Sequence, residues 1–431
     1  MSSGAPRVLI VGGGGREHAL AWALARSPAR PELLIAPGNA GTVKLARTIA
    51  IAVDEPRKIS EAARREAVDL VVVGPEAPLC AGLADLLTDD GVAVFGCSRA
   101  AAEIEGSKVF CKSLLHRHGI PTAVFGAFSM VPEAELFIDS HFVEGSRIVV
   151  KDDGLAGGKG VRICEGRKEA KRAAKEVLSA GGTRHVVIEE FLIGREASLM
   201  AFVVDEEVVA LPGAEDHKTL LAGDRGPMTG GMGVVCPTPV LDDVSARRAL
   251  EEVLRPTARA MCAEGRPFRG LLFAGLMLTE AGPKALEFNC RFGDPETEAI
   301  MVRLEEGPRG DLLAALDSVA RGSAPRPLQF SASVSTTVVI AQAGYPGALQ
   351  PPVEIDGLAA ADAITGVTVF HAGTRLDGDR VMTAGGRVLA VTAVGADVHE
   401  ARQRAYAAVD VIELEGAQVR RDIGLRQMKG E

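Results

Sequence analysis

The chain has 431 residues, of which 47% are hydrophobic, 4% aromatic and 24% charged, and its formal net charge at pH 7 is −9. This length exceeds one ordinary hydrophobic core, so we expect two to four domains. The negative charge and the scarcity of aromatic residues argue against a nucleic-acid-binding surface.

Seven dispersed cysteines form no C-x-x-C pair, which favours free thiols in a reducing compartment. No signal peptide is visible, and no apolar run approaches the roughly 18–20 residues of a membrane span. We therefore expect a cytoplasmic protein with no membrane partner.

The first hundred residues alternate short apolar runs with helical patterns. The runs at 8–11, 33–36, 70–73 and 92–95 predict strands, and the segments 17–25 and 83–87 predict helices. This alternation is typical of a doubly wound parallel sheet.

A glycine-rich turn follows the first predicted strand and precedes the first helix. Backbone N–H groups in such a turn bind anions. The turn is not a dinucleotide fingerprint, because Glu17 stands where the third glycine should be. Arg16 favours a phosphate monoester instead. With the loops at 37–42 and 74–79 on the same sheet edge, the pattern predicts a site for a sugar phosphate; a turn without ligand is the alternative.

Residues 123–193 indicate a small α+β unit. Strands are expected near 124–128, 147–151, 161–164 and 185–190, with helices near 133–140 and 167–179. The glycine-rich segment 154–160 carries Lys159 between two strands and lacks the Walker A spacing. We interpret it as a flap over nucleotide phosphates, which Lys151 would also reach; an exposed hairpin is the alternative.

An antiparallel region follows, with strands expected near 197–204, 207–211, 271–279 and 284–290 and a helical pattern at 244–263. In its last strand, alternation places Glu287, Asn289 and Arg291 on one face. The same alternation turns a second row toward a core: Leu286, Phe288, Cys290 and Phe292. A carboxylate and an amide oxygen beside a guanidinium suit a Mg²⁺-nucleotide site.

Two further segments carry polar groups that suit small ligands. Asp216 would hold an ammonium group and Lys218 a phosphate or carboxylate, beside a glycine-rich loop at 223–233 that exposes N–H donors. Backbone groups of Phe191 and Leu192 would read adenine, with Glu196 on the ribose. The alternative for the segment 216–233 is a solvated loop, and the alternative for Phe191, Leu192 and Glu196 is an ordinary strand end.

After residue 325 the chain turns β-rich, with strands expected at 332–341, 367–371 and 387–393 and a helix at 397–409. This tail has the composition of a separate small domain.

Taken in order, the motifs resemble the glycinamide ribonucleotide synthetase (phosphoribosylamine–glycine ligase) family of the ATP-grasp superfamily, over essentially the whole chain. The most specific are Asp216-His-Lys218, Thr229-Gly-Gly-Met-Gly233 and Glu287-Phe-Asn-Cys-Arg-Phe-Gly-Asp-Pro-Glu296. Met228 departs from the family pattern, which has Asn there. The resemblance implies an α/β protein with an amino-terminal phosphoribosyl-binding domain (1–104), an ATP-grasp domain (105–325) with a lid (123–193), and a carboxyl-terminal domain (326–431).

The resemblance also implies a reaction: ATP, glycine and 5-phosphoribosylamine give glycinamide ribonucleotide, ADP and phosphate through a glycyl phosphate. The implied ATP-binding residues are Lys108, Lys151, Gly158, Lys159, Gly160, Glu190, Phe191, Leu192 and Glu196. The implied substrate-binding residues are Gly14, Gly15, Arg16, Glu17, Asn39, Gly41, Thr42, Pro75, Glu76, Asp216, Lys218, Gly231 and Arg291. Glu287 and Asn289 would hold Mg²⁺ or Mn²⁺, and Arg291, Asp216 and Lys218 would be catalytic.

Three alternatives compete with this function. They are an ATP-grasp ligase for a different carboxylate, a nucleotide-binding protein without catalysis, and a nicotinamide dehydrogenase, which Glu17 disfavours. We expect small-molecule substrates only, and a monomer.

Overall fold

The computed structural model describes residues 5–155, 160–180 and 184–429. The amino-terminal part is a five-stranded parallel sheet in the order β3-β2-β1-β4-β5. Its strands are β1 (Arg7–Gly12), β2 (Glu32–Pro37), β3 (Arg47–Thr48), β4 (Leu70–Val73) and β5 (Ala93–Phe95). Its helical segments are α1 (Gly15–Leu24), η1 (Thr42–Lys44), α2 (Pro56–Arg65), α3 (Glu76–Cys80) and α4 (Leu83–Asp89). The central strands are buried on both faces, as continuous apolar runs predict.

Two helices lead out of this sheet toward the middle of the chain: α5 (Arg99–Gly106) and α6 (Lys108–Arg117). Ser107 follows the last residue of α5 and precedes the first residue of α6. Its hydroxyl accepts a hydrogen bond from the N–H of Phe110 and so caps the start of α6. Such a cap is typical of a helix start. It fixes Lys108 at the first position of α6.

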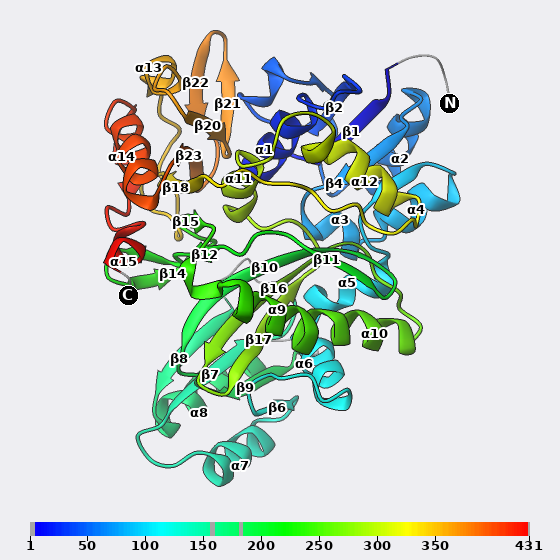
Figure 1. Cartoon of the computed structure of the whole chain (residues 1–431). Coiled ribbons are helices and arrows are strands. Elements are labelled where there is room, and N and C mark those ends of the chain that lie inside the picture. Colours follow the sequence, from blue (N-terminus) through cyan, green and yellow to red (C-terminus); the bar gives the residue numbers. More distant parts are fainter. Residues whose placement is uncertain (1–4, 156–159, 181–183, 430–431) are drawn as a thin grey trace.

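The unit predicted at 123–193 is a four-stranded antiparallel sheet in the order β6-β9-β7-β8. Its elements are β6 (Phe125–Phe128), α7 (Val131–His141), β7 (Arg147–Asp152), β8 (Val161–Glu165), α8 (Arg167–Ser179) and β9 (Val186–Glu190). Both helices pack together on the sheet over a small core of their own. In Figure 1 this unit (cyan to green) lies at the opposite end of the molecule from the amino-terminal sheet and the carboxyl-terminal part.

The central sheet is antiparallel in the order β11-β10-β16-β17. Its strands are β10 (Arg195–Val204), β11 (Glu207–Ala210), β16 (Arg269–Thr279) and β17 (Gly282–Asn289). The predicted helical stretch at 244–263 is α9 (Asp243–Ala249), a π-helical turn η3 (Leu250–Leu254) and α10 (Arg255–Ala263). The π turn precedes Pro256, which has no N–H to donate to a preceding carbonyl.

The last sheet combines strands from the middle and the end of the chain, in the order β12-β15-β18-β23-β20, with β25 paired to β18. These strands are β12 (Glu215–Asp216), β15 (Gly233–Cys236), β18 (Val334–Ala341), β20 (Val367–His371), β23 (Arg387–Gly395) and β25 (Gln418–Val419). The β15–β18 pairing crosses the predicted boundary at 325/326. The domain boundaries therefore stay predictions.

Short elements complete the chain. The paired strands are β13 (Thr219–Leu221) with β14 (Arg225–Met228), β19 (Ile355–Asp356) with β24 (Glu413–Leu414), and β21 (Thr374–Asp377) with β22 (Arg380–Thr383). The helical segments are η2 (Pro239–Leu241), α11 (Glu296–Met301), η4 (Gly307–Gly310), α12 (Leu312–Ala320), α13 (Leu358–Asp362), α14 (Val398–Val409) and α15 (Leu425–Lys429). Since α12 packs against both β5 and β16, it joins the amino-terminal and central sheets.

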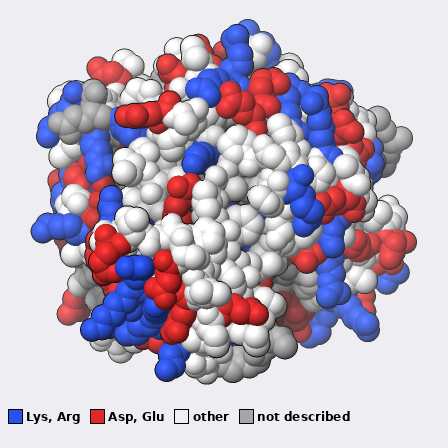
Figure 2. All heavy atoms as spheres, turned by 90° about the horizontal axis from the view of Figure 1, so that it is seen from below, with Lys and Arg blue, Asp and Glu red and all other residues white. Residues whose placement is uncertain are grey.

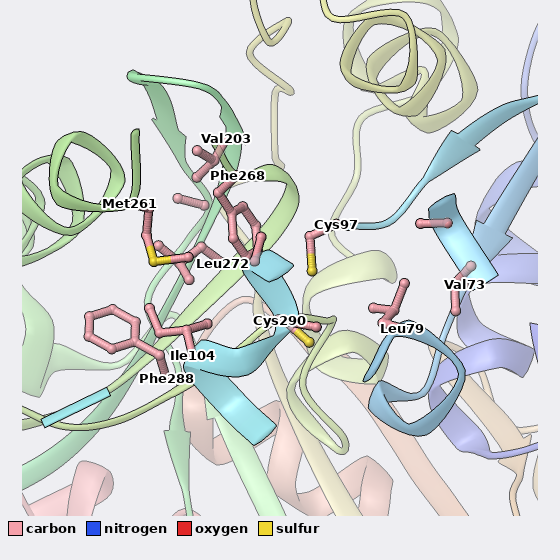
Figure 3. Packing of buried hydrophobic residues seen from close by; sticks show 14 of the residues in the cluster. Val73, Leu79, Cys97, Ile104, Val203, Met261, Phe268, Leu272, Phe288 and Cys290 are labelled. Carbon is pink, nitrogen blue, oxygen red and sulfur yellow. The ribbon is translucent and has the colours of Figure 1, made fainter. Parts of the chain in front are cut away.

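Two large hydrophobic clusters each join several of the sheets. One cluster includes Val8, Phe202, Phe292, Leu316 and Phe370, which come from the beginning, middle and end of the chain. A second lies under β17, where Figure 3 shows Phe288 and Cys290 near Ile104 and Leu272.

On the face in Figure 2, Lys and Arg side chains are interspersed with Asp and Glu around a largely uncharged centre. In the described part of the chain, no helix has both the length and the apolar character to cross a membrane.

Candidate active site

A cavity of about 410 Å³ opens where the central sheet, the lid, the amino-terminal sheet and the β12–β15 loop meet. Many of the predicted site residues line it: Arg16, Glu76, Lys108, Lys151, Gly160, Glu190, Phe191, Leu192, Glu196, Asp216, Lys218, Glu287, Asn289 and Arg291. Gly158 and Lys159 lie outside the described residues. Residues more than 200 positions apart thus share one cavity.

The polar face of β17 forms one wall. Glu287, Asn289 and Arg291 all line the cavity, and the Arg291 guanidinium donates to Asn289 Oδ1 (3.1 Å). Burial alone would raise the pKa of the Glu287 carboxyl. The ammonium groups of Lys218 and Lys151, with other cations, outweigh burial, so the pKa is lowered. Glu287 is therefore an ionised carboxylate facing a cluster of cations.

One detail of the predicted alternation is wrong. Leu286 was expected in the core beside Phe288, yet a β-bulge leaves it without a register partner: Glu287 pairs with Gly275 and Ala285 with Leu276. The extra residue shifts the alternation. As a result, Leu286 lines the cavity and packs against the small cluster of Leu192 and Met277.

Lysines from two elements approach this wall from the lid side. Lys108 Nζ donates to the carbonyl of Gly154 (2.7 Å), where the predicted flap begins. Lys151 Nζ donates to the carbonyl of Leu286 (3.1 Å) and lies 2.9 Å from Glu189 Oε1. Burial lowers the pKa of Lys108, and the Glu287 carboxylate opposes that shift.

The strand end after β9 forms an apolar slot. Leu192 is 8% exposed, and the guanidinium of Arg147 lies 3.7 Å from the ring centroid of Phe191. The Glu190 carboxylate accepts hydrogen bonds from the N–H of Val124 (3.0 Å) and from Lys284 Nζ (3.1 Å). Phe191 and Leu192 thus line the cavity beside the Glu190 carboxylate, and apolar walls with a few polar groups are typical of small-molecule sites.

Asp216 and Lys218 face the same cavity from the loop after β12. Oδ1 of Asp216 is buried and accepts no hydrogen bond from the described residues. Burial, reinforced by Glu296, raises the pKa of the Asp216 carboxyl. Burial would lower the pKa of Lys218, but the carboxylates of Glu287 and Glu196 outweigh it, and the pKa is raised. An unpartnered buried carboxyl oxygen indicates a cationic or hydrogen-donating ligand.

The amino-terminal glycine turn is held largely by the chain's own side chains. Glu17 accepts hydrogen bonds from the N–H of Gly14 (2.5 Å) and from Arg16 Nε (2.6 Å). The Arg16 guanidinium also donates to the carbonyl of Phe292 (2.9 Å). Glu17 therefore shapes the turn from behind, and Arg16 reaches the cavity.

Asn39 connects the neighbouring loops. Its amide donates to the carbonyls of Gly13 (3.0 Å) and His371 (2.8 Å), and its Oδ1 accepts from the N–H of Gly41 (2.9 Å) and of Thr42 (3.1 Å). Some predicted substrate-binding residues are absent from the described cavity lining: Gly14, Gly15, Glu17, Asn39, Gly41, Thr42, Pro75 and Gly231. Their contact with substrate stays a prediction.

The beginning and end of the chain meet at two histidines. His18 Nδ1 accepts a hydrogen bond from the N–H of His371 (2.8 Å). Burial, followed by the effects of His371 and Lys44, lowers the pKa of His18 to about 3. The ring is therefore neutral at physiological pH, as an acceptor nitrogen must be.

Sequence reasoning did not select several charged residues of the cavity. Arg387 of β23 donates to the carbonyls of Gly230 (2.6 Å) and Asp294 (2.7 Å) and pairs with the Asp294 carboxylate (3.0 Å). Glu105 pairs with Arg291 (3.2 Å), and Glu296 accepts from Ser198 Oγ (2.8 Å). Asp294 and Glu296 lie inside the Glu287–Glu296 motif already noted, and Arg387 opens the strand predicted at 387–393 directly after two glycines. Their charge at these positions was the available signal.

Comparisons with known proteins show the family to which the chain belongs. Three family models match in order: the phosphoribosylglycinamide synthetase N domain (residues 6–105), its ATP-grasp (A) domain (106–297) and its C domain (335–426). The phosphoribosylamine–glycine ligase of Rhodopirellula baltica is 46% identical over 427 residues, covering 96% of each chain. That of Allochromatium vinosum is 45% identical, covering 99% of each. The chain belongs to the phosphoribosylglycinamide synthetase family.

The solved structure of phosphoribosylamine–glycine ligase from Thermotoga maritima superposes with a TM-score of 0.82 at 34% identity, covering 97% of this chain and all of that one. The predicted family, the α/β fold class with an ATP-grasp core, and the prediction of a ligase are confirmed. ATP-grasp enzymes of this kind use ATP and divalent metal ions.

Proposed function

We propose that this protein joins glycine to 5-phosphoribosylamine with ATP, giving glycinamide ribonucleotide, ADP and phosphate. The observation that carries the assignment of roles is one shared cavity. In it the Glu287–Asn289–Arg291 row faces Lys218 and Asp216, whose Oδ1 has no hydrogen-bond partner among the described residues, with Lys108 and Lys151 beside them. The cavity thus combines oxygen ligands, cations for phosphates and a buried carboxyl group for an amine.

The nucleotide occupies the lid side in this proposal. The slot around Phe191 and Leu192 takes adenine, and Glu190 and Glu196 border the ribose. Lys108 and Lys151 contact the phosphates, and we propose the same role for Lys159, which lies outside the described residues. Catalysis then rests on positioning and on neutralising charge, and it needs no covalent enzyme intermediate.

Glu287 and Asn289 fit a divalent cation. They supply an ionised carboxylate and an amide oxygen from adjacent positions on one strand face. Magnesium prefers such oxygen ligands and usually completes its shell with water and phosphate oxygens, so two protein ligands suffice. When bound, the cation supplies charge neutralisation at the phosphates. We propose Mg²⁺, with Mn²⁺ as a substitute.

The amino acid lies between Asp216 and Arg291. The Asp216 carboxyl accepts the glycine ammonium group, and the Arg291 and Lys218 cations orient the glycine carboxylate. Transfer of the γ-phosphoryl group from ATP to that carboxylate gives an acyl phosphate and ADP. The phosphoribosylamine nitrogen then attacks the acyl carbon and phosphate leaves, so the amide bond forms as the acyl–phosphate bond breaks. Arg16 and Glu76 border the sugar phosphate.

The first test measures ADP release by the purified protein with Mg-ATP and phosphoribosylamine generated in situ, with and without glycine. Glycine-dependent ADP together with a product of the mass of glycinamide ribonucleotide supports the proposal. ADP release that prefers another carboxylate overturns glycine as the substrate and directs attention to Met228, which lines the cavity. Absence of turnover despite ATP binding overturns the enzyme assignment.

We also propose that the protein is a cytoplasmic monomer that acts on small molecules only. The net charge of −9 and the mixed charges in Figure 2 support the exclusion of nucleic acid. Light scattering coupled to gel filtration measures the mass directly, and a dimer mass would contradict the monomer.

A further inference from the structure

A bridge of two lysines and one glutamate, largely excluded from solvent, lines the lid side of the cavity. Lys112 Nζ lies 2.9 Å from one carboxylate oxygen of Glu189, and Lys151 Nζ lies 2.9 Å from the other. The side chains of Lys112 and Glu189 are each 2% exposed, and that of Lys151 is 8% exposed. Two cations thus share one anion away from solvent.

Burying such a group costs free energy unless each charge is compensated. Burial would raise the pKa of Glu189, but Lys151 and Lys112 outweigh it and lower the pKa. Burial, reinforced by Lys151, lowers the pKa of Lys112. A fold needing only a filled core would place an apolar side chain at Lys112, so the retained cation indicates a role for its charge.

The contacts of Lys112 lie on the cavity side of α6 and not at the protein surface. It stands four residues after Lys108 on α6, so the two lysines share a helix face toward the cavity. Lys112 Nζ also donates to Thr122 Oγ1 (2.7 Å), and Thr122 in turn donates to the carbonyl of Ala285 on β17 (2.7 Å). Lys112 therefore has one fixed partner on the β17 side and one on the lid strand β9.

Lys151 depends on the same carboxylate. Its two contacts are Glu189 and the carbonyl of Leu286, which leave its ammonium at the cavity wall. Without the charge of Lys112, the whole carboxylate of Glu189 would be available to Lys151. It would then hold Lys151 more strongly, and the cavity would lose one positive charge.

We propose that Lys112 is a positioning residue of the nucleotide site: by binding the far oxygen of Glu189, it leaves Lys151 oriented and available for the nucleotide phosphates. This rests on the proposed role of Lys151 as a phosphate ligand. Lys112 acts here through Glu189 and does not contact the reacting atoms.

The test is a double-mutant cycle on Mg-ATP binding, measured by isothermal titration calorimetry with the whole protein. The variants are Lys112→Met, Lys151→Met and the pair together. Lys112→Met should weaken Mg-ATP binding about tenfold, the scale of coupling between charged neighbours. It should leave KM for glycine at saturating ATP within about twofold. In the Lys151→Met background the same change should have little further effect.

Controls separate positioning from folding. Lys112→Arg keeps the cation and should restore most of the affinity. Thr122→Val removes the other partner of Lys112 while keeping Glu189, and it should leave Mg-ATP affinity near that of the wild type. If Lys112→Met does not fold, Lys112→Gln keeps hydrogen bonding without the charge and gives the same readout.

The outcomes are distinct. Unchanged ATP affinity in Lys112→Met, or effects of the two single changes that simply add, overturns the inference about Lys112 alone. Unchanged affinity in Lys151→Met overturns the phosphate role of Lys151 and the inference with it. The glycine-dependent ADP assay is independent of both, so its failure is a failure of the proposed function.

Discussion

Lys218 Nζ lies 3.7 Å from Oε1 of Glu287 across the cavity. A predicted catalytic cation and a predicted metal ligand thus compensate each other's charge. The ammonium groups of Lys151 in the lid and Lys108 on α6 also help to lower the pKa of Glu287. Removal of the Glu287 carboxylate would leave the neighbouring cations, among them Lys218 and Lys151, with less negative charge to compensate them.

Glu287→Gln should lower the rate of ATP turnover at least about 100-fold, the usual effect of removing a preorganised charge from a phosphoryl-transfer site. The global fold should persist. ADP formation and thermal unfolding measure the two effects, with Glu280→Gln, in the exposed turn before β17, as the matched control. Activity near that of the wild type in Glu287→Gln would refute the metal assignment.

Asp216→Asn should raise KM for glycine about 10- to 100-fold, because a hydrogen bond to a charged group contributes about 1.5–3 kcal/mol. The Kd for Mg-ATP should stay unchanged, since Asp216 faces the loop side of the cavity. Steady-state kinetics with varied glycine and calorimetry with Mg-ATP test the pair of expectations. A weaker Mg-ATP complex with a normal KM for glycine would contradict the proposal, because it would assign Asp216 to nucleotide binding and not to glycine binding.

Removal of divalent cations should stop ADP formation without unfolding the protein, because Glu287 and Asn289 lie at the cavity and not in a structural core. Activity should return on addition of Mg²⁺ or Mn²⁺. The assay with excess chelator, followed by back-titration with each cation, measures this. Full activity in chelator would contradict the cofactor proposal.

Glu298 should make the protein less stable as pH rises. Both of its carboxyl oxygens are buried without a hydrogen-bond partner among the described residues, and Oε1 abuts Gly15 at the start of α1. Burial, reinforced by the nearby Asp294 carboxylate, raises its pKa well above 4.5. Arg387 on β23 and Arg16 on α1 oppose that shift.

The folded state therefore holds a proton that the unfolded state releases above about pH 4.5, so the free energy of unfolding falls from there up to the folded pKa. Glu298→Gln removes this loss. Its Tm should exceed that of the wild type at pH 7–8 and the difference should shrink toward pH 4.5. Glu306→Gln, at a side chain that is 92% exposed, is the control. A constant difference across pH would refute the protonated carboxyl.

Arg420→Met should lower the free energy of unfolding by about 1–3 kcal/mol, because it removes a buried charged donor whose carboxylate partners are themselves partly exposed. The Arg420 side chain is 1% exposed and pairs with Asp224 (3.2 Å) and Asp422 (2.7 Å). Its neighbour offers the control, because Arg421 pairs with Asp410 at the surface and Arg421→Met should cost at most about 1 kcal/mol. Urea unfolding measures both, and equal effects would contradict the prediction.

The sequence pattern located the face of β17 correctly, since strand alternation is a local property. Phe288 and Cys290 are buried and Glu287 and Asn289 face the cavity. The bulge at Leu286 escaped prediction because it depends on the partner strand β16. The Lys112–Glu189 pair escaped for a similar reason: each residue alone has the pattern of an ordinary helix or strand charge.

The glycine turn shows the limit of motif reasoning. Free N–H groups were expected there, but the Glu17 carboxylate accepts the N–H of Gly14. The Arg16 guanidinium donates to the carbonyl of Phe292, a residue 276 positions later, and no local pattern reveals that contact.

The pairing of β15 with β18 has a consequence for how the protein is made. During synthesis a chain folds as its segments emerge from the ribosome. Val234 and Val235 cannot meet their neighbours Thr337 and Thr336 until the ribosome has added that later strand. The loop that carries Asp216 and Lys218 is attached to the same strand through β12. The side of the cavity that carries Asp216 and Lys218 therefore cannot be completed until translation has passed β18, however early the lid and the central sheet have formed.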